Sequence, residues 1–151
     1  TLLFTDGYSI ENDIFCDGNL EELLVGTEVA KFRSELDDFV HWYALALTRH
    51  LNDHTMSIAT HPKQVLDPAH KPTLLALEPG ESYPTSMKTT LLADYKRLIR
   101  GKSLLGLLIQ NTNSRPGQPK HTDKALLEMV AVRPGAKVTR LFNAIEALFS
   151  F

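Results

Sequence analysis

The stretch that follows Gly26 constrains the fold most strongly. Thr27 is a favourable N-cap residue, and apolar residues then recur at spacings of three and four, as on the core-facing side of an α-helix: Val29, Phe32, Leu36, Phe39, Val40, Tyr43 and Leu47. The charged residues between them fall mostly elsewhere and fit a solvated surface. Helices must cover such a stripe, so the sequence predicts a mainly α, bundle-like domain.

The same periodicity returns in four later segments, at residues 86–99, 102–109, 122–130 and 138–149. Two stretches of the chain lack this helical periodicity. Residues 54–84 contain prolines at 62, 68, 72, 79 and 84, which predicts a long loop with one possible strand at 73–77. Residues 111–120 are rich in Asn, Ser, Pro and Gly and predict a flexible loop.

The chain opens on a short apolar run, Leu2 to Thr5, which fits a buried strand that ends at Asp6 and Gly7. Ser9 then caps a short helix with Ile14 and Phe15 on its inner face. Because the first residue is Thr1 rather than Met and the strand begins at once, we expect the chain to be a segment of a longer protein.

Composition bounds the class of protein. The 151 residues are 43% hydrophobic and 23% charged, which is the balance of one globular domain over 1–151. No run reaches the ~18 apolar residues of a membrane span, and a signal-peptide layout is missing, so we expect no membrane partner and a cytoplasmic location. The net charge of −2 means that any contact with nucleic acid must use a local basic patch.

Three oxygen-bearing side chains, Asp6, Ser9 and Glu11, cluster at the predicted strand-to-helix turn. Carboxylate and hydroxyl oxygens are ligands that Mg²⁺ and Mn²⁺ prefer, so these residues are candidate metal ligands. The same residue types also serve as ordinary turn, capping and first-turn residues, and the local sequence leaves both interpretations open.

Gly101, Lys102 and Ser103 resemble the end of a P-loop. The glycine that a P-loop requires five positions earlier is absent, because position 96 is lysine, and a helix precedes the motif rather than a strand. A nucleotide P-loop is therefore excluded. Lys102 at a helix start, close to Lys96, Arg97 and Arg100 in the sequence, can still contact a phosphate; a solvated helix face is the alternative.

Two stretches together resemble a known family. TDGYSIENDIF at 5–15 and YKRLIRGKSLLGLL at 95–108 are similar to the DUF4435 family, Toprim-type proteins related to the nuclease half of OLD-family proteins. The first also resembles the Asp-x-x-Ser-x-Glu arrangement of OLD-type Toprim sites, met here by Asp6, Ser9 and Glu11.

This resemblance implies a metal-dependent nuclease, with a function in phage defence and DNA favoured as the nucleic-acid partner. Mg²⁺ or Mn²⁺ would be held by Asp6, Ser9 and Glu11, and Glu11 and Lys102 would be catalytic, with Lys102 on the phosphate side. The N-terminal strand would continue a Toprim-like α/β sheet. The remaining metal ligands of the family are expected before Thr1, so the chain would be the helical C-terminal part of the enzyme.

Two alternatives remain open. The chain is a non-catalytic helical module that docks on a partner ATPase subunit, which an exposed apolar patch on the C-terminal helices would favour. Otherwise it is a sensor that binds a phosphate-bearing ligand through Arg100 and Lys102 without cleaving it.

Overall fold

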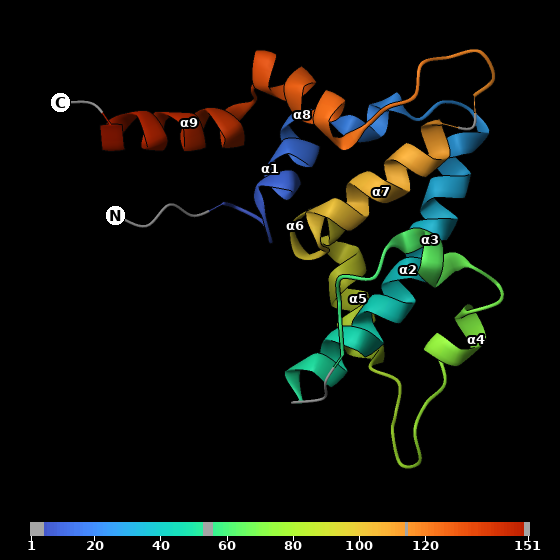
Figure 1. Cartoon of the computed structure of the whole chain (residues 1–151). Helices are drawn as coiled ribbons and strands as arrows, with labels where there is room; N and C mark the ends of the chain where they lie inside the picture. Colours follow the sequence, from blue (N-terminus) through green and yellow to red (C-terminus); the bar gives the residue numbers. More distant parts are fainter. Residues whose placement is uncertain (1–4, 53–55, 114, 150–151) are drawn as a thin grey trace.

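Helix α2 (Thr27–Leu51) is the long axis of the computed structural model, which describes residues 5–52, 56–113 and 115–149 (Figure 1). Within those residues the secondary structure is helical, without a strand, which confirms the prediction of a mainly α domain. The predicted strand falls largely on residues 2–4, outside the described ranges. None of the described helices has the length and apolar character needed to cross a membrane.

In order, the elements are α1 (Ile10–Asp17), the 3-10 turn η1 (Leu20–Leu23), α2, α3 (Pro62–Leu66), α4 (Lys71–Leu74), α5 (Thr85–Ala93), α6 (Tyr95–Leu98), α7 (Gly101–Thr112), α8 (Asp123–Val132) and α9 (Ala136–Phe149).

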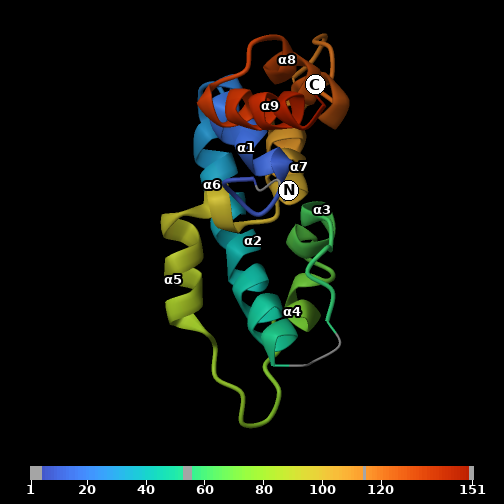
Figure 2. The ribbon, with the colours of Figure 1, turned by 90° about the vertical axis from the view of Figure 1, so that its left-hand side faces the viewer.

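The predicted apolar stripe of α2 is largely the core of the molecule. Helix α5 packs on one side of α2, α3 on the other, and α7 also contacts it (Figure 2). Because these helices pack on α2 from several directions, residues beside the predicted stripe are buried as well. The fully buried residues of α2 include Trp42, Ala44 and Ala46 as well as Phe32, Leu36, Phe39, Val40 and Tyr43. Val29, in the first turns of the helix, remains exposed.

The proline-rich segment contains two short helices where the sequence predicts a loop. Proline is tolerated in the first turn of a helix, where its missing N–H has no intrahelical acceptor. Helix α3 begins at Pro62 and α4 has Pro72 in its first turn. The strand predicted at 73–77 is wrong, because Thr73 and Leu74 end α4.

The segment between α7 and α8 is held to the body at both of its ends. Helix α7 continues to Thr112, beyond the predicted start of the loop. Asn113 and His121 exchange two hydrogen bonds, of 3.1 and 2.8 Å, that close the loop. Arg115 donates from Nε to Glu28 Oε2 at 2.7 Å and from Nη2 to the Leu23 carbonyl, so the loop is tied to the start of α2. Its flexibility stays a prediction.

Arg115 gives the fold a testable acid dependence. Its hydrogen bonds lower the pKa of Glu28 from 4.5 to about 2. Because the folded pKa is the lower one, the pair contributes stability fully above about pH 4.5, and this contribution is lost as the pH falls towards 2. We expect Arg115→Gln to lower the thermal midpoint of unfolding near neutral pH. In this variant the midpoint should also decrease less steeply as the pH falls from about 4.5 towards 2. The matched variant Arg133→Gln, at an exposed arginine, should keep the wild-type slope, and equal slopes in all three proteins would refute the assignment.

Candidate functional site

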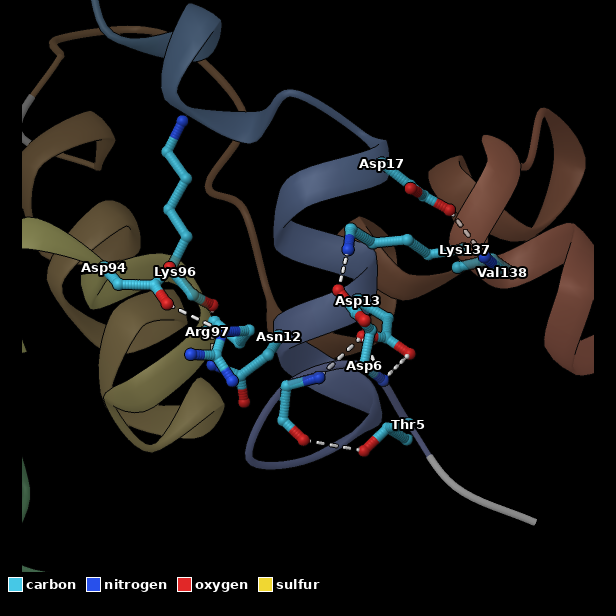
Figure 3. A network of polar contacts seen from close by, with 11 residues as sticks. Thr5, Asp6, Asn12, Asp13, Asp17, Asp94, Lys96, Arg97, Lys137 and Val138 are labelled. Atoms are coloured by element: carbon cyan, nitrogen blue, oxygen red, sulfur yellow. Dashed lines mark hydrogen bonds and ion pairs between the residues drawn. The ribbon is translucent and has the colours of Figure 1, made fainter.

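The turn before α1 is shaped by a buried carboxylate. Asp13 is only 1% exposed, and its oxygens accept hydrogen bonds from the backbone N–H of Asp6 at 3.1 Å and of Gly7 at 3.2 Å (Figure 3). Thr5 Oγ1 donates to the Gly7 carbonyl at 2.9 Å and tightens the same turn. Residues 5–9 therefore fold back onto α1 rather than extending away from it.

The side chain of Asn12 joins this turn to the second sequence motif. Its Nδ2 donates to the carbonyl oxygen of Lys96 at 2.8 Å (Figure 3). The same Nδ2 donates to the carbonyl oxygen of Ile99 at 2.7 Å, just before α7. Its Oδ1 accepts from the backbone N–H and the hydroxyl of Ser9, each at 3.0 Å. Asn12 thus satisfies buried backbone groups in two segments that lie more than eighty residues apart in the sequence.

Gly101 lets α7 begin directly against α1. A Cβ atom at this position would lie 2.6 Å from the Glu11 Cβ and 2.8 Å from the Asn12 backbone nitrogen, closer than real contacts allow. On the other side of the turn, the Tyr8 N–H donates to the Arg97 carbonyl at 2.9 Å. The missing side chain of Gly101 therefore brings its neighbours Arg100 and Lys102 beside the start of α1.

These contacts produce a surface hollow of about 280 Å³, lined by Tyr8, Ser9, Glu11, Arg100 and Lys102. We call it the first hollow. The structure thus brings together three of the four predicted site residues, Ser9, Glu11 and Lys102, and adds Tyr8 and Arg100. Two cations face one carboxylate, and the first turn of α7 has no side-chain cap. The dipole of α7 also favours an anion at that end.

Tyr43 of α2 lies behind this hollow and carries no charge. Burial raises the pKa of its hydroxyl to about 12, and the nearby Tyr8 adds to the rise, whereas a hydrogen bond from the backbone of Arg100 opposes it. The phenol stays neutral across the physiological range. The charge of the hollow therefore comes from Glu11, Arg100 and Lys102.

Asp6, the fourth predicted site residue, does not line the hollow. Its carboxylate forms an ion pair with Lys137 of α9, which also lowers the pKa of Asp6 (Figure 3). The Ser9 hydroxyl lines the hollow but donates its hydrogen to Asn12. Across residues 5–52, 56–113 and 115–149, no three His, Cys, Asp or Glu side chains are grouped closely enough to hold a metal ion. One carboxylate, that of Glu11, lines the hollow together with two cations, so this lining suits an anion, and the metal site predicted at Asp6, Ser9 and Glu11 stays a prediction.

Comparison with known proteins leaves the site to be interpreted from its own geometry. No protein-family model, curated protein or solved structure matches this chain. The resemblance to DUF4435 and Toprim-type proteins therefore stays a prediction.

Asn12 and Asp13 are the residues that the sequence interpretation missed. Both are polar and both are 1% exposed, and they position the site without lining it. The sequence offers one signal for them: two adjacent polar residues directly before the buried pair Ile14 and Phe15. Their partners are mostly backbone atoms, which leave no trace in the residue pattern.

Two glycines of α7 provide a matched test of this geometry. We expect Gly101→Ala to destabilise the fold by about 1–3 kcal/mol, because the new methyl group must displace α1. Gly106→Ala places its Cβ at an ordinary 3.4 Å from His61 Nε2, so the gain in helix propensity of about 0.5–1 kcal/mol should prevail. Denaturant unfolding measures both. Equal effects of the two substitutions would contradict the close approach of α7 and α1.

Proposed function

We propose that the first hollow binds a phosphodiester group of a nucleic acid. The observation that supports this most directly is the placement of Arg100 and Lys102 on either side of Gly101, at the uncapped start of α7. A guanidinium and an ammonium group at a helix N-terminus present several N–H donors to phosphate oxygens. The protein as a whole carries a net charge of −2, so this local pair of cations, and not a general basic surface, would attract the ligand.

Cleavage of the bound phosphodiester is the further part of the proposal, and it rests on the resemblance to Toprim-type nucleases. Mg²⁺ often binds proteins through only one or two carboxylates together with substrate phosphates. Glu11 is the residue of the first hollow able to offer such an oxygen, and a bound metal would activate the attacking water. Lys102 would stabilise the charge that develops on the phosphate.

Binding is tested with the double variant Arg100→Ala/Lys102→Ala. We expect it to bind a labelled oligonucleotide at least about tenfold more weakly in fluorescence anisotropy, since two charged contacts are lost. The slope of log affinity against log salt should become shallower by about 1.4–1.8, which is the share of two phosphate contacts. Lys120→Ala/Arg133→Ala removes the same charge from exposed positions outside the hollow and should behave as wild type. If both double variants lose the same affinity for the oligonucleotide, the loss reflects the lower overall positive charge and not a specific site in the hollow.

Cleavage is tested separately, with single substitutions placed in the full-length protein. Glu11→Gln should retain oligonucleotide binding and lose cleavage of plasmid DNA in the presence of Mg²⁺ or Mn²⁺. Undiminished cleavage by both Glu11→Gln and Lys102→Ala would refute the catalytic assignment. Binding without cleavage by the wild-type full-length protein would support the sensor alternative instead.

A second candidate function is supported by the C-terminal helices. On α9 the first apolar residues, Val138 and Leu141, are buried, and α9 packs on α1. Later positions of the same stripe remain exposed, and α9 extends away from the other helices (Figure 1). Exposed apolar residues of α8 and α9 are Met129, Val132, Phe142, Ile145, Leu148 and Phe149. An apolar helix face of this kind suits a docking module, such as one that binds an ATPase subunit.

This candidate makes a prediction for the isolated chain. Uncovered apolar surface on α9 should drive concentration-dependent self-association, and Phe142→Ser/Ile145→Ser should abolish it, as measured by sedimentation velocity. Leu51→Ser changes a leucine at the end of α2 that is more exposed than Phe142 or Ile145, and serves as the control. A wild-type chain that stays monomeric over a wide concentration range would argue against a docking role for this face.

A further inference from the structure

A second hollow, of about 430 Å³, adjoins the first one and shares Arg100 and Lys102 with it. The other polar residues of its lining are His61 and Lys63 from α3 and its N-cap, Gln110 from α7, and Asp123 at the start of α8. Arg100 and Lys102 therefore stand between two hollows rather than at the end of one. Together the two hollows contain three permanent cations and two carboxylates, those of Glu11 and Asp123.

His61 adds a further donor to the second hollow. As the N-cap of α3, its Nδ1 accepts a hydrogen bond from the Lys63 N–H at 3.1 Å. Because Nδ1 accepts in this bond, Nε2 is the ring nitrogen that carries a proton. The Nε2 atom lies beside Gly106, another lining residue, where the absence of a side chain leaves room. An N–H donor and the Lys63 ammonium group are thus available to a second phosphate.

Tyr8 gives the first hollow an aromatic surface. The residue is 51% exposed although its backbone is fixed by the bond to Arg97. A large aromatic ring that stays in water beside two cations is the arrangement with which proteins hold unpaired bases, because every base offers a flat face for stacking. Bases inside a duplex are already stacked on one another and offer no such face.

We propose that the ligand is a single-stranded nucleic acid whose backbone passes from the first hollow to the second, across Arg100 and Lys102, with one base stacked on Tyr8. This inference rests on the proposed phosphate-binding function and specifies its ligand. Consecutive phosphates would meet Arg100 and Lys102, and then Lys63 and His61.

The charge distribution also limits the length of the bound strand. A further hollow lies beyond Lys63 and shares it, but the charged residues that it adds are one cation, Lys31, and two carboxylates, those of Glu35 and Asp67. Lys31 lies 3.8 Å from Glu35, and the same carboxylate accepts from Gln110 at 2.7 Å. Because the surface beyond Lys63 adds more negative than positive charge, the strand should leave the protein near Lys63. The site then covers only a few nucleotides.

The experiment compares single-stranded DNA, single-stranded RNA and a duplex of the same sequence by anisotropy at one salt concentration. Single strands should bind more tightly than the duplex, and affinity should stop rising once the oligonucleotide exceeds about four nucleotides, the lower end of known single-strand sites. Tyr8→Leu keeps an apolar side chain but removes the ring face, and should weaken single-strand binding by about tenfold. Tyr8→Trp should retain it, and Lys63→Ala should weaken it for oligonucleotides long enough to reach the second hollow.

Control variants distinguish failure of the single-strand inference from failure of the proposed phosphate binding. Leu77→Ala changes an exposed apolar residue outside both hollows and should have no effect, and thermal melts establish that each variant is folded. If the duplex binds as well as the single strands and Tyr8→Leu is neutral, while Arg100→Ala/Lys102→Ala still weakens binding, the single-strand inference is overturned and phosphate binding stands. If no oligonucleotide binds the wild type, the proposed function itself falls. A preference between the DNA and RNA arms would identify the sugar that the site accepts.

Discussion

The buried side chain of Asn12 is the interaction on which the candidate site depends. Without it, the Ile99 carbonyl would lose its partner in a buried bond, and a buried unsatisfied polar group costs about 1–3 kcal/mol. The Lys96 carbonyl and the Ser9 N–H would lose partners in partly buried bonds. Asparagine suits this place because it carries two donors and an acceptor on one rigid amide. A carboxylate of the same shape would direct lone pairs at the carbonyls of Lys96 and Ile99. The amide therefore fixes the distance between the two motifs.

Helix α1 also anchors the neighbouring helix α9. Its residue Asp17 accepts a hydrogen bond from the Val138 N–H at 2.5 Å, in the first turn of α9, and the turn before α1 contributes the Asp6 partner of Lys137. These two contacts fix how α9 starts. The eight residues of α1 thus contact α6, α7, α8 and α9, and the hollow and the exposed face of α9 are attached to one short helix.

Local periodicity was enough to predict the longer helices, because a burial stripe such as that of α2 repeats over many turns, but it did not predict the short helices α3 and α4. It was not enough to decide which stripes are covered: α9 has as regular a stripe as α2, yet much of it remains in water. The proximity of Glu11 and Lys102 was expected only from the resemblance, since residues ninety apart carry no mutual pattern. The ion pair of Asp6 could not be predicted for the same reason, because its partner Lys137 is 131 positions away in the sequence. Tyr8 and Arg100 flank predicted site residues, but their exposure and direction follow from the fold.

The two candidate functions place compatible demands on the fold. Phosphate binding requires a rigid hollow, and the hydrogen bonds of Asn12 and Asp13 supply that rigidity from within α1. Docking requires an apolar surface that remains uncovered, and α9 provides it because only its first turns are anchored to α1. Both demands meet at α1, because this helix carries Glu11 and is also the helix on which α9 packs.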